Sequence, residues 1–237
     1  MKQDLMHKDV HDVNITPEER RNIWQLWRQN LKDWVWYTQE NPDWLDDLEK
    51  EAHKTNVPVI RTQMQTMIRF LMIERKPVSI LEVGCAIGFS ALLMSEYMPK
   101  GSHITTIENY DVRIKSAKEN FHRFDREGEI TLLEGDAAEI LPTLKDKYDF
   151  IFMDAAKGQY INFLPEIKRL MPDNGMLLPD NVLQDGDVIE SRFIVERRNR
   201  TIHSRMREYL YALTHDKELT TVILQLGDGA AVSIKAV

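Results

Sequence analysis

The sequence predicts an α/β fold, in which a mostly parallel seven-stranded sheet is wrapped by helices, ends in an antiparallel hairpin and follows a helical arm. Two observations predict it. From Val78 onward, short apolar runs alternate with helical segments, which is typical of a parallel sheet covered by helices. The last two runs are instead joined by Gly227-Asp228-Gly229, and so short a glycine turn predicts an antiparallel hairpin.

The expected elements follow one another without a long linker or an internal repeat. The apolar runs that predict strands are Val78–Val83, Ile104–Glu108, Ile130–Leu133, Tyr148–Met153, Met176–Leu178, Thr221–Leu226 and Ala231–Ile234. The segments that predict helices between them are Phe89–Tyr97, Asp111–Phe124, Ala137–Leu144, Tyr160–Leu170 and Ile194–Thr214.

Residues 1–75 are expected to form the helical arm, and residues 76–237 the main domain. Thr16-Pro17-Glu18-Glu19 begins a helix, because Thr16 can cap it and Glu19 completes a capping box. A second helix is expected over Asp43–Asn56 and a third after Val57-Pro58. All five tryptophans lie between Trp24 and Trp44. We favour packing of these tryptophans on the main domain or on a second subunit. The alternative is that they form a platform on which nucleic-acid bases stack.

Composition limits the class of protein. With 237 residues, 43% of them hydrophobic, the chain can bury a sizeable core. A net charge of −7 argues against a generally nucleic-acid-coated protein but leaves room for a local basic patch. Cys85 is the single cysteine, so no internal disulfide is possible and a reduced cytoplasm is favoured. The polar N-terminus predicts no signal peptide, and the lack of a long apolar stretch predicts no membrane span.

Three consecutive strand ends predict a nucleoside site. Gly84 and Gly88 form a strand-to-helix turn that lets a ligand approach the backbone. Glu108 ends the next strand, where a carboxylate can accept hydrogen bonds from ribose hydroxyls. Asp136 can bind an adenine amino group, and Ala137 offers a backbone amide. The pyrophosphate motif of dinucleotide sites is missing, so S-adenosylmethionine fits better than a nicotinamide cofactor. The alternative is that these acids merely cap helices.

The next two strand ends predict a reaction site. Asp154 ends one buried run, and Asp180-Asn181 follows the next. Three oxygen ligands at neighbouring strand ends suit Mg²⁺, with Mn²⁺ or Ca²⁺ as substitutes. Lys157 lies three residues after Asp154 and is placed to accept a proton from a hydroxyl. A surface helix pair is the ordinary explanation of Asp-x-x-Lys, but the two oxygen partners of Asp154 weigh against it.

These motifs resemble the cation-dependent O-methyltransferases, the family of catechol and caffeoyl-CoA methyltransferases. The resemblance covers about Val57 to the C-terminus and implies a Rossmann-like class I methyltransferase that is a homodimer. It assigns metal binding to the two aspartates and the asparagine, and general base to Lys157. It also implies a set of residues around the cofactor, namely Ile60, Ser90, Glu108, Asp136, Ala137 and Asp154.

Three motifs look most like those of the bacterial tRNA 5-hydroxyuridine methyltransferases within that family: Asp154-Ala155-Ala156-Lys157-Gly158-Gln159-Tyr160, Asp180-Asn181-Val182-Leu183 and Gly227-Asp228-Gly229. This resemblance implies formation of 5-methoxyuridine at the wobble position (U34). An arginine-rich segment fits an anticodon loop, since its charge opposes the acidic average of the chain. The arginines expected to bind RNA are Arg192, Arg197, Arg198, Arg200 and Arg205. The alternative for these charges is a solvated helix face, and the alternative acceptor is a small catechol or phenol. A dehydrogenase and a non-catalytic RNA-binding protein fit the motifs less well.

Overall fold

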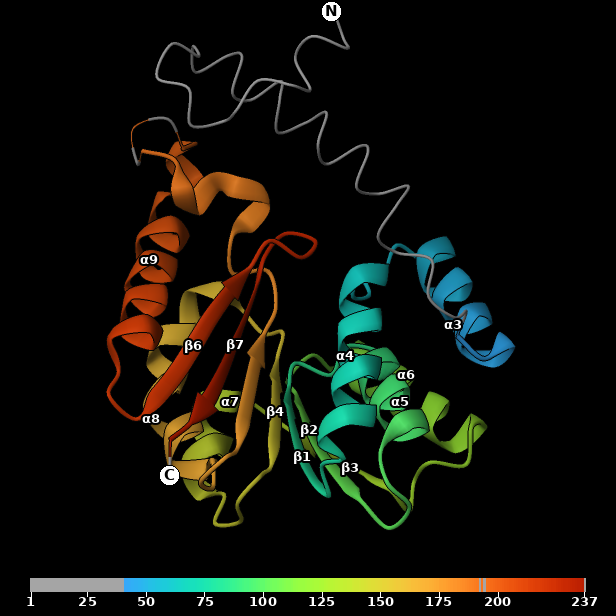
Figure 1. Cartoon of the computed structure of the whole chain (residues 1–237). Coiled ribbons are helices and arrows are strands. Elements are labelled where there is room, and N and C mark those ends of the chain that lie inside the picture. The colour runs from blue at the N-terminus through green and yellow to red at the C-terminus, as the bar shows by residue number, and fades with distance from the viewer. Residues whose placement is uncertain (1–40, 192, 194, 237) are drawn as a thin grey trace, which may run out of the picture. The chain divides into compact units, whose positions relative to one another are not determined.

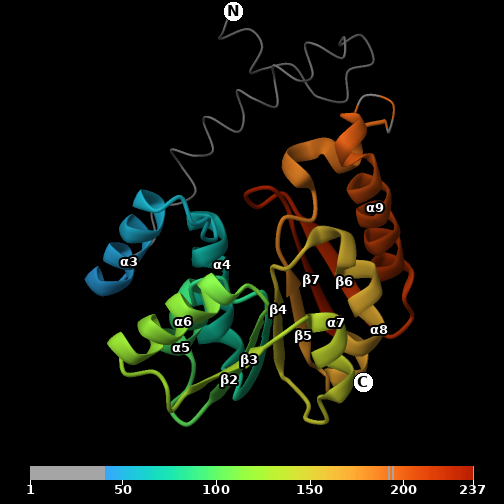
Figure 2. The ribbon, with the colours of Figure 1, turned by 180° about the vertical axis from the view of Figure 1, so that it is seen from behind.

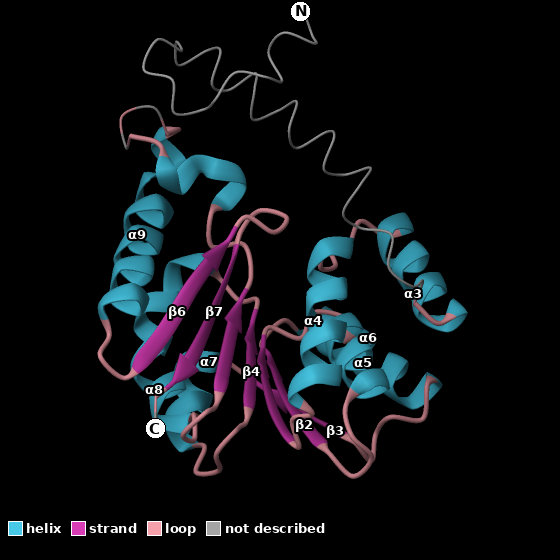
Figure 3. Ribbon diagram, in the orientation of Figure 1, coloured by secondary structure: helices cyan, strands magenta, loops and turns pink. Residues whose placement is uncertain are grey.

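The structure is a computed structural model and describes residues 41–191, 193 and 195–236. This part of the chain forms a seven-stranded sheet (Figure 1). Its strands are β1 (Ser79–Val83), β2 (His103–Glu108), β3 (Ile130–Glu134), β4 (Phe150–Met153), β5 (Met176–Pro179), β6 (Leu219–Leu224) and β7 (Ala230–Lys235). They lie in the order β3-β2-β1-β4-β5-β7-β6. The first five strands pair in parallel, and β7 pairs antiparallel with both β5 and β6 (Figure 3). The predicted Rossmann-like fold is therefore confirmed.

Helices cover both faces of the sheet (Figure 2). One layer consists of α3 (Asp43–Lys54), α4 (Thr62–Arg75), α5 (Phe89–Tyr97) and α6 (Asp111–Arg123). The other layer consists of α7 (Ala137–Ile140), α8 (Tyr160–Leu170) and α9 (Arg200–His215). Because both faces are covered, every residue of β4 and of β5 is buried. Parallel strands covered on both faces are expected to be continuously apolar, which explains the uninterrupted runs in the sequence.

The order of the strands reverses between β1 and β4, and this places the site. The chain runs from β1 outward to β3, then returns to β4 on the other side of β1. At such a switch point the loops leave in opposite directions, and a crevice opens beyond the carboxyl ends of the strands. Val83 pairs with Met153 there, and Met153 pairs with Pro179. The residues that follow these three strands therefore meet at one edge of the sheet.

Three expected boundaries are corrected. The helical region predicted from Ile194 becomes a helix only at Arg200, since the stripe of residues that α9 buries begins at His203. The helix predicted over Ala137–Leu144 stops at Ile140 and continues as a 3-10 turn around Pro142, whose ring does not extend an α-helix. The C-terminal hairpin has a longer loop than expected, because β6 ends at Leu224 and β7 begins at Ala230.

The second and third helices of the predicted arm lie within the described residues as α3 and α4. Trp44 of α3 packs on Phe124, with 4.6 Å between ring centroids. The first predicted helix and the other four tryptophans fall in residues 1–40, outside the described residues, so the proposed role of that segment stays a prediction. In the described part of the chain, no helix is long and apolar enough to cross a membrane.

Candidate active site

Gly84 and Asp154 lie against each other at the switch point. The Asp154 amide donates to the Val83 carbonyl at 2.9 Å, which continues the β1–β4 pairing past the end of the strands. Gly84 has φ +101°, and a Cβ there would collide with the Asp154 carbonyl oxygen and lie 2.8 Å from its carbon. Glycine is therefore required for two reasons, the backbone conformation and the close approach of the neighbouring chain.

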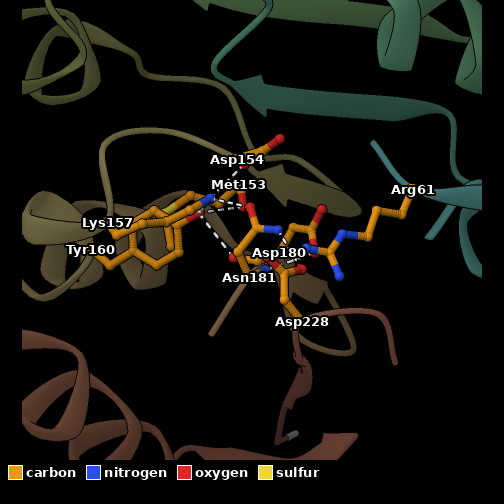
Figure 4. Close-up of polar contacts among 8 residues, drawn as sticks. All are labelled: Arg61, Met153, Asp154, Lys157, Tyr160, Asp180, Asn181 and Asp228. Atoms are coloured by element: carbon orange, nitrogen blue, oxygen red, sulfur yellow. Dashed lines mark hydrogen bonds and ion pairs between the residues drawn. The ribbon is translucent and has the colours of Figure 1, made fainter. Parts of the chain in front are cut away.

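Lys157 lies among the oxygen atoms predicted to hold a metal (Figure 4). Its ammonium donates to Asp154 Oδ1 at 2.6 Å and also to Asn181 Oδ1. The Tyr160 hydroxyl is 3.2 Å from the same nitrogen. That hydroxyl is itself buried and donates to the Met153 carbonyl at 3.0 Å. The lysine therefore comes from the turn after β4 but contacts groups that follow both β4 and β5.

Asp180 is the buried carboxylate of the set, 3% exposed, and is held at the end of β5. Its amide donates to the Met153 carbonyl at 2.9 Å, and its Oδ1 accepts from the Asn181 amide at 2.7 Å. Burial, followed by the nearby Asp154 charge, raises the pKa of Asp180 to about 7, although Lys157 opposes the rise. Negative charge is thus costly at this position unless a cation is close.

Two adjoining cavities meet at Asp154. One, of about 470 Å³, reaches toward the carboxyl ends of β2 and β3 and is lined by Gly135, Asp136 and Ala137. The other, of about 350 Å³, is lined by Ile60, Ser90, Asp180, Asn181 and Asp228, among others. Gly84, Glu108, Arg113 and Asp154 line both. The structure therefore brings the predicted nucleoside residues and the predicted metal ligands to a crevice of two adjoining cavities.

The nucleoside carboxylates also have partners within the chain. Glu108 accepts from the Ala86 amide at 2.7 Å with Oε2, and from the amides of Asn109 and Tyr110 at 3.0 Å with Oε1. Asp136 caps α7 by accepting from the Ala138 amide at 2.8 Å. Asp136 therefore caps a helix, as the alternative expects, whereas Glu108 binds amides of two loops. Because each carboxylate oxygen can accept more than one hydrogen bond, capping leaves capacity for a ligand.

Glu82 was not among the predicted site residues. It is fully buried in the middle of the sheet, where its Oε1 accepts from the Ser90 hydroxyl at 2.5 Å and its Oε2 from the Thr106 hydroxyl. Burial raises its pKa to about 7, although both hydroxyl contacts oppose the rise. A signal was present in the sequence: an acid inside the apolar run Ile80–Val83 is too costly to bury without a role.

The arginines of the arginine-rich segment make two kinds of contact. Arg197 and Arg198 are exposed, and Arg198 pairs with Glu196 at 2.7 Å. Arg205 instead donates to the Gly158 carbonyl at 2.9 Å, which ties α9 to the turn that carries Lys157. Arg200 and Arg207 likewise donate to backbone carbonyls. Arg192 lies outside the described residues. Arg205 remains exposed despite this bond, so the RNA-binding role of these arginines stays a prediction. His203 beside them is buried.

Among the described residues, no group of three or more His, Cys, Asp and Glu side chains is arranged to hold a metal ion. The predicted set differs in composition, because it combines two carboxylates with the asparagine amide. A site at the switch point of a doubly wound sheet, with two adjoining cavities and a lysine among oxygen atoms, defines a Rossmann-like domain with a ligand site at the carboxyl ends of its strands.

Comparison with known proteins identifies the family. A profile described as O-methyltransferase matches residues 37–236, and the chain belongs to this family. The O-methyltransferase ankF of Aspergillus thermomutatus is 33% identical over 63% of the chain, and the catechol O-methyltransferase of Niastella koreensis is 30% identical over 47%. These matches span 62% and 52% of the two relatives, less than two thirds of their length.

Solved structures share the fold. A caffeoyl-CoA O-methyltransferase candidate from Staphylococcus aureus, 30% identical, superposes with a TM-score of 0.79 over 89% of this chain and 100% of its own. The SAH-bound methyltransferase PaMTH1 of Podospora anserina, 24% identical, gives 0.78 over 94% of this chain and 99% of its own. The O-methyltransferase family predicted from the sequence motifs is therefore confirmed.

Proposed function

We propose that this chain is an S-adenosylmethionine-dependent O-methyltransferase that activates a hydroxyl at a divalent-metal site and acts on 5-hydroxyuridine at the tRNA wobble position. The observation that carries the proposal is the position of Lys157. Its amine contacts Asp154 at 2.6 Å, and Asp154 lines both cavities. Lys157 lines neither cavity itself, but it is one hydrogen bond from a residue that lines both. This supports a role as proton acceptor between a methyl donor in one cavity and an acceptor oxygen in the other.

S-adenosylmethionine fits the larger cavity and the region that the two cavities share. Glu108 and Asp136 offer carboxylates for ribose and adenine, and the glycine turn at Gly84 gives a close approach to the backbone. The crevice carries no pyrophosphate motif, so a cofactor with adenosine and no phosphate is the better match. PaMTH1, of similar fold, was solved with SAH bound, which supports the same cofactor class here.

The oxygen set fits a divalent cation. Asp154 Oδ1 and Asn181 Oδ1 already hold a positive charge, the Lys157 ammonium, and buried Asp180 has a raised pKa. Oxygen ligands of this kind suit Mg²⁺, with Mn²⁺ or Ca²⁺ as substitutes. Asp154, Asp180 and Asn181 would hold the ion. When bound, it would lower the pKa of an acceptor hydroxyl and orient it.

The residues of the chain perform the remaining tasks. Asp154, at the junction of the cavities, orients donor and acceptor toward each other. Lys157 takes the hydroxyl proton on its Nζ in its neutral form, and Tyr160 lies 3.2 Å from that nitrogen, which limits where the amine can move.

Exposed Arg197 and Arg198 support an RNA acceptor, because guanidinium groups bind the phosphates that flank an anticodon base. A catechol is the second candidate. It presents two adjacent oxygens, as 5-hydroxyuracil does, and the N. koreensis relative is a catechol O-methyltransferase. A homodimer is part of the proposal and would be tested by light scattering.

The substrate class is tested by nucleoside mass spectrometry of tRNA from a strain that lacks the gene. We expect 5-methoxyuridine to disappear and 5-hydroxyuridine to accumulate. The purified chain should restore the methyl group in vitro with S-adenosylmethionine, and a chelator should stop the reaction until Mg²⁺ is returned. Unchanged 5-methoxyuridine in the strain, together with efficient methylation of catechol in vitro, would favour the second candidate.

A further inference from the structure

Asn181 is held at both ends of its side-chain amide (Figure 4). Its Nδ2 donates to Asp228 Oδ1 at 2.5 Å, and its Oδ1 accepts from the Lys157 ammonium. We propose that Asp228 is a positioning residue that fixes the amide orientation of Asn181 and so presents its oxygen to the proposed metal site. The expected effect on metal binding rests on the proposed function. The orientation of the Asn181 amide does not, because its hydrogen bonds are present without a metal.

The chemistry of the partners allows only one orientation of the amide. An ionised carboxylate is purely an acceptor, and an ammonium is purely a donor. A rotation of the Asn181 amide by half a turn would place its oxygen against Asp228 and its NH₂ group against Lys157, so both contacts would become repulsive. If a cation took the place of the Lys157 ammonium beside the Asn181 oxygen, the hydrogen bond to Asp228 would still fix the orientation of the amide.

Asp228 is itself held in place. Its Oδ2 pairs with Arg61, which precedes α4, at 3.5 Å, and its side chain is only 13% exposed. Its backbone carbonyl accepts from the Leu183 amide at 3.0 Å. Arg61 and Asp228 both line the cavity that contains Asp180 and Asn181. The turn between β6 and β7 is thus joined to the loop after β5.

The backbone of this junction does not depend on the Asp228 side chain. The Val182 amide donates to the Gly229 carbonyl at 2.9 Å, and a Cβ on Gly229 would lie 2.6 Å from the Leu183 nitrogen. Asn181 adopts φ +57°, a left-handed conformation that asparagine tolerates better than most residues. Substitution of Asp228 should therefore leave the loop in place while it frees the amide and, in Asp228→Ala, also removes the ion pair with Arg61.

The test measures Mn²⁺ binding to the purified chain of 237 residues by electron paramagnetic resonance, without any turnover. Loss of a group that orients a ligand typically weakens metal binding by about 10- to 100-fold, and we expect this for Asp228→Ala. Asp228→Asn should stay within about threefold of wild type, because its carbonyl oxygen still accepts the same hydrogen bond. Arg61→Gln removes the ion pair but leaves the amide bonded, and serves as the matched control.

The outcomes separate the alternatives. Wild-type affinity in Asp228→Ala would overturn the proposal, as would equal losses in the Ala and Asn variants, which would point to the charge of Asp228 instead. If the wild-type chain binds no Mn²⁺, the proposed metal role fails, but the positioning role is still decided by NMR of the metal-free chain. The Asn181 side-chain NH₂ signal should be protected from hydrogen exchange in wild type and Asp228→Asn and lose that protection in Asp228→Ala. Equal protection in all three would contradict the proposal.

Discussion

At the scale of single residues, the candidate site is assembled from polar side chains that stand just beyond the ends of buried strands. Asp154 and Asp180-Asn181 follow apolar runs, so their meeting at one edge follows from parallel strands alone. In the sequence, Asp228 is notable only as part of the turn Gly227-Asp228-Gly229. Its hydrogen bond with Asn181 depends on β7 lying beside β5, a pairing between distant segments that no local pattern indicates.

Lys157→Ala should lower kcat by about 100- to 10,000-fold, the usual contribution of a general base, with little change in cofactor affinity. The reason is that Lys157 contacts the Asp154 and Asn181 oxygens and not the nucleoside end of the crevice. Lys157→Arg is the control, because a guanidinium keeps the positive charge but does not release a proton to become a base. Single-turnover rates and S-adenosylmethionine titrations measure the two effects. Full activity in Lys157→Arg would rule out the base role.

Gly84→Ala should destabilise the fold by about 2–4 kcal/mol, from the left-handed backbone and the overpacking together. The added Cβ would collide with the Asp154 carbonyl and force β1 and β4 apart. Gly101→Ala is the control, since Gly101 has a similar φ of +87° but nothing within 4 Å of its Cβ position. Its cost should be about 1 kcal/mol. Urea unfolding measures both, and equal decreases in stability would show that the close approach carries no energy.

At the scale of elements, periodicity predicts the buried strands and the amphipathic helices, while their boundaries depend on tertiary packing. Phe89–Tyr97 and Tyr160–Leu170 begin and end as predicted. The start of α9 was predicted too early, because Val195 is apolar and buried yet packs outside a helix. Hydrophobicity alone does not distinguish a buried loop residue from the first turn of a helix.

The buried acid in β1 gives a test at the same scale. The pKa of Glu82 rises from its ordinary 4.5 to about 7, so the folded chain holds a proton that the unfolded chain releases. Protonated Glu82 therefore contributes most to the stability of the folded chain below pH 4.5, and this contribution is lost as the pH rises toward 7. The loss amounts to on the order of 3 kcal/mol. The glutamine in Glu82→Gln cannot titrate, so this variant should not show the loss of stability that comes from Glu82.

Urea unfolding at pH 5 and pH 8 measures the difference between wild type and Glu82→Gln. Wild type should lose more stability than the variant between these two values. Asp180 also has a pKa raised to about 7, but it is present in both proteins, so its contribution cancels. Parallel pH profiles would mean that Glu82 stays ionised in the folded chain.

At the scale of the whole molecule, the crevice supports the proposed methyl transfer but does not select the acceptor. A catechol and a 5-hydroxyuracil would present the same pair of oxygens to the proposed site, so its chemistry would not separate them. The discriminating feature must lie outside the crevice. Charge is the candidate, since an RNA brings phosphates to a chain whose net charge is −7 and needs a local reversal of sign.

Arg197→Glu/Arg198→Glu should weaken tRNA binding and reduce the slope of log affinity against log salt by about 1 for each phosphate that the chain no longer neutralises. Both arginines are exposed before α9, so the change should leave folding intact. Lys115→Glu/Lys118→Glu on α6 changes the net charge by the same amount on the other layer of helices and is the control. Fluorescence titration at several salt concentrations measures both variants. If the two variants weaken binding equally, the chain responds to total charge alone; if neither does, tRNA binds at another surface.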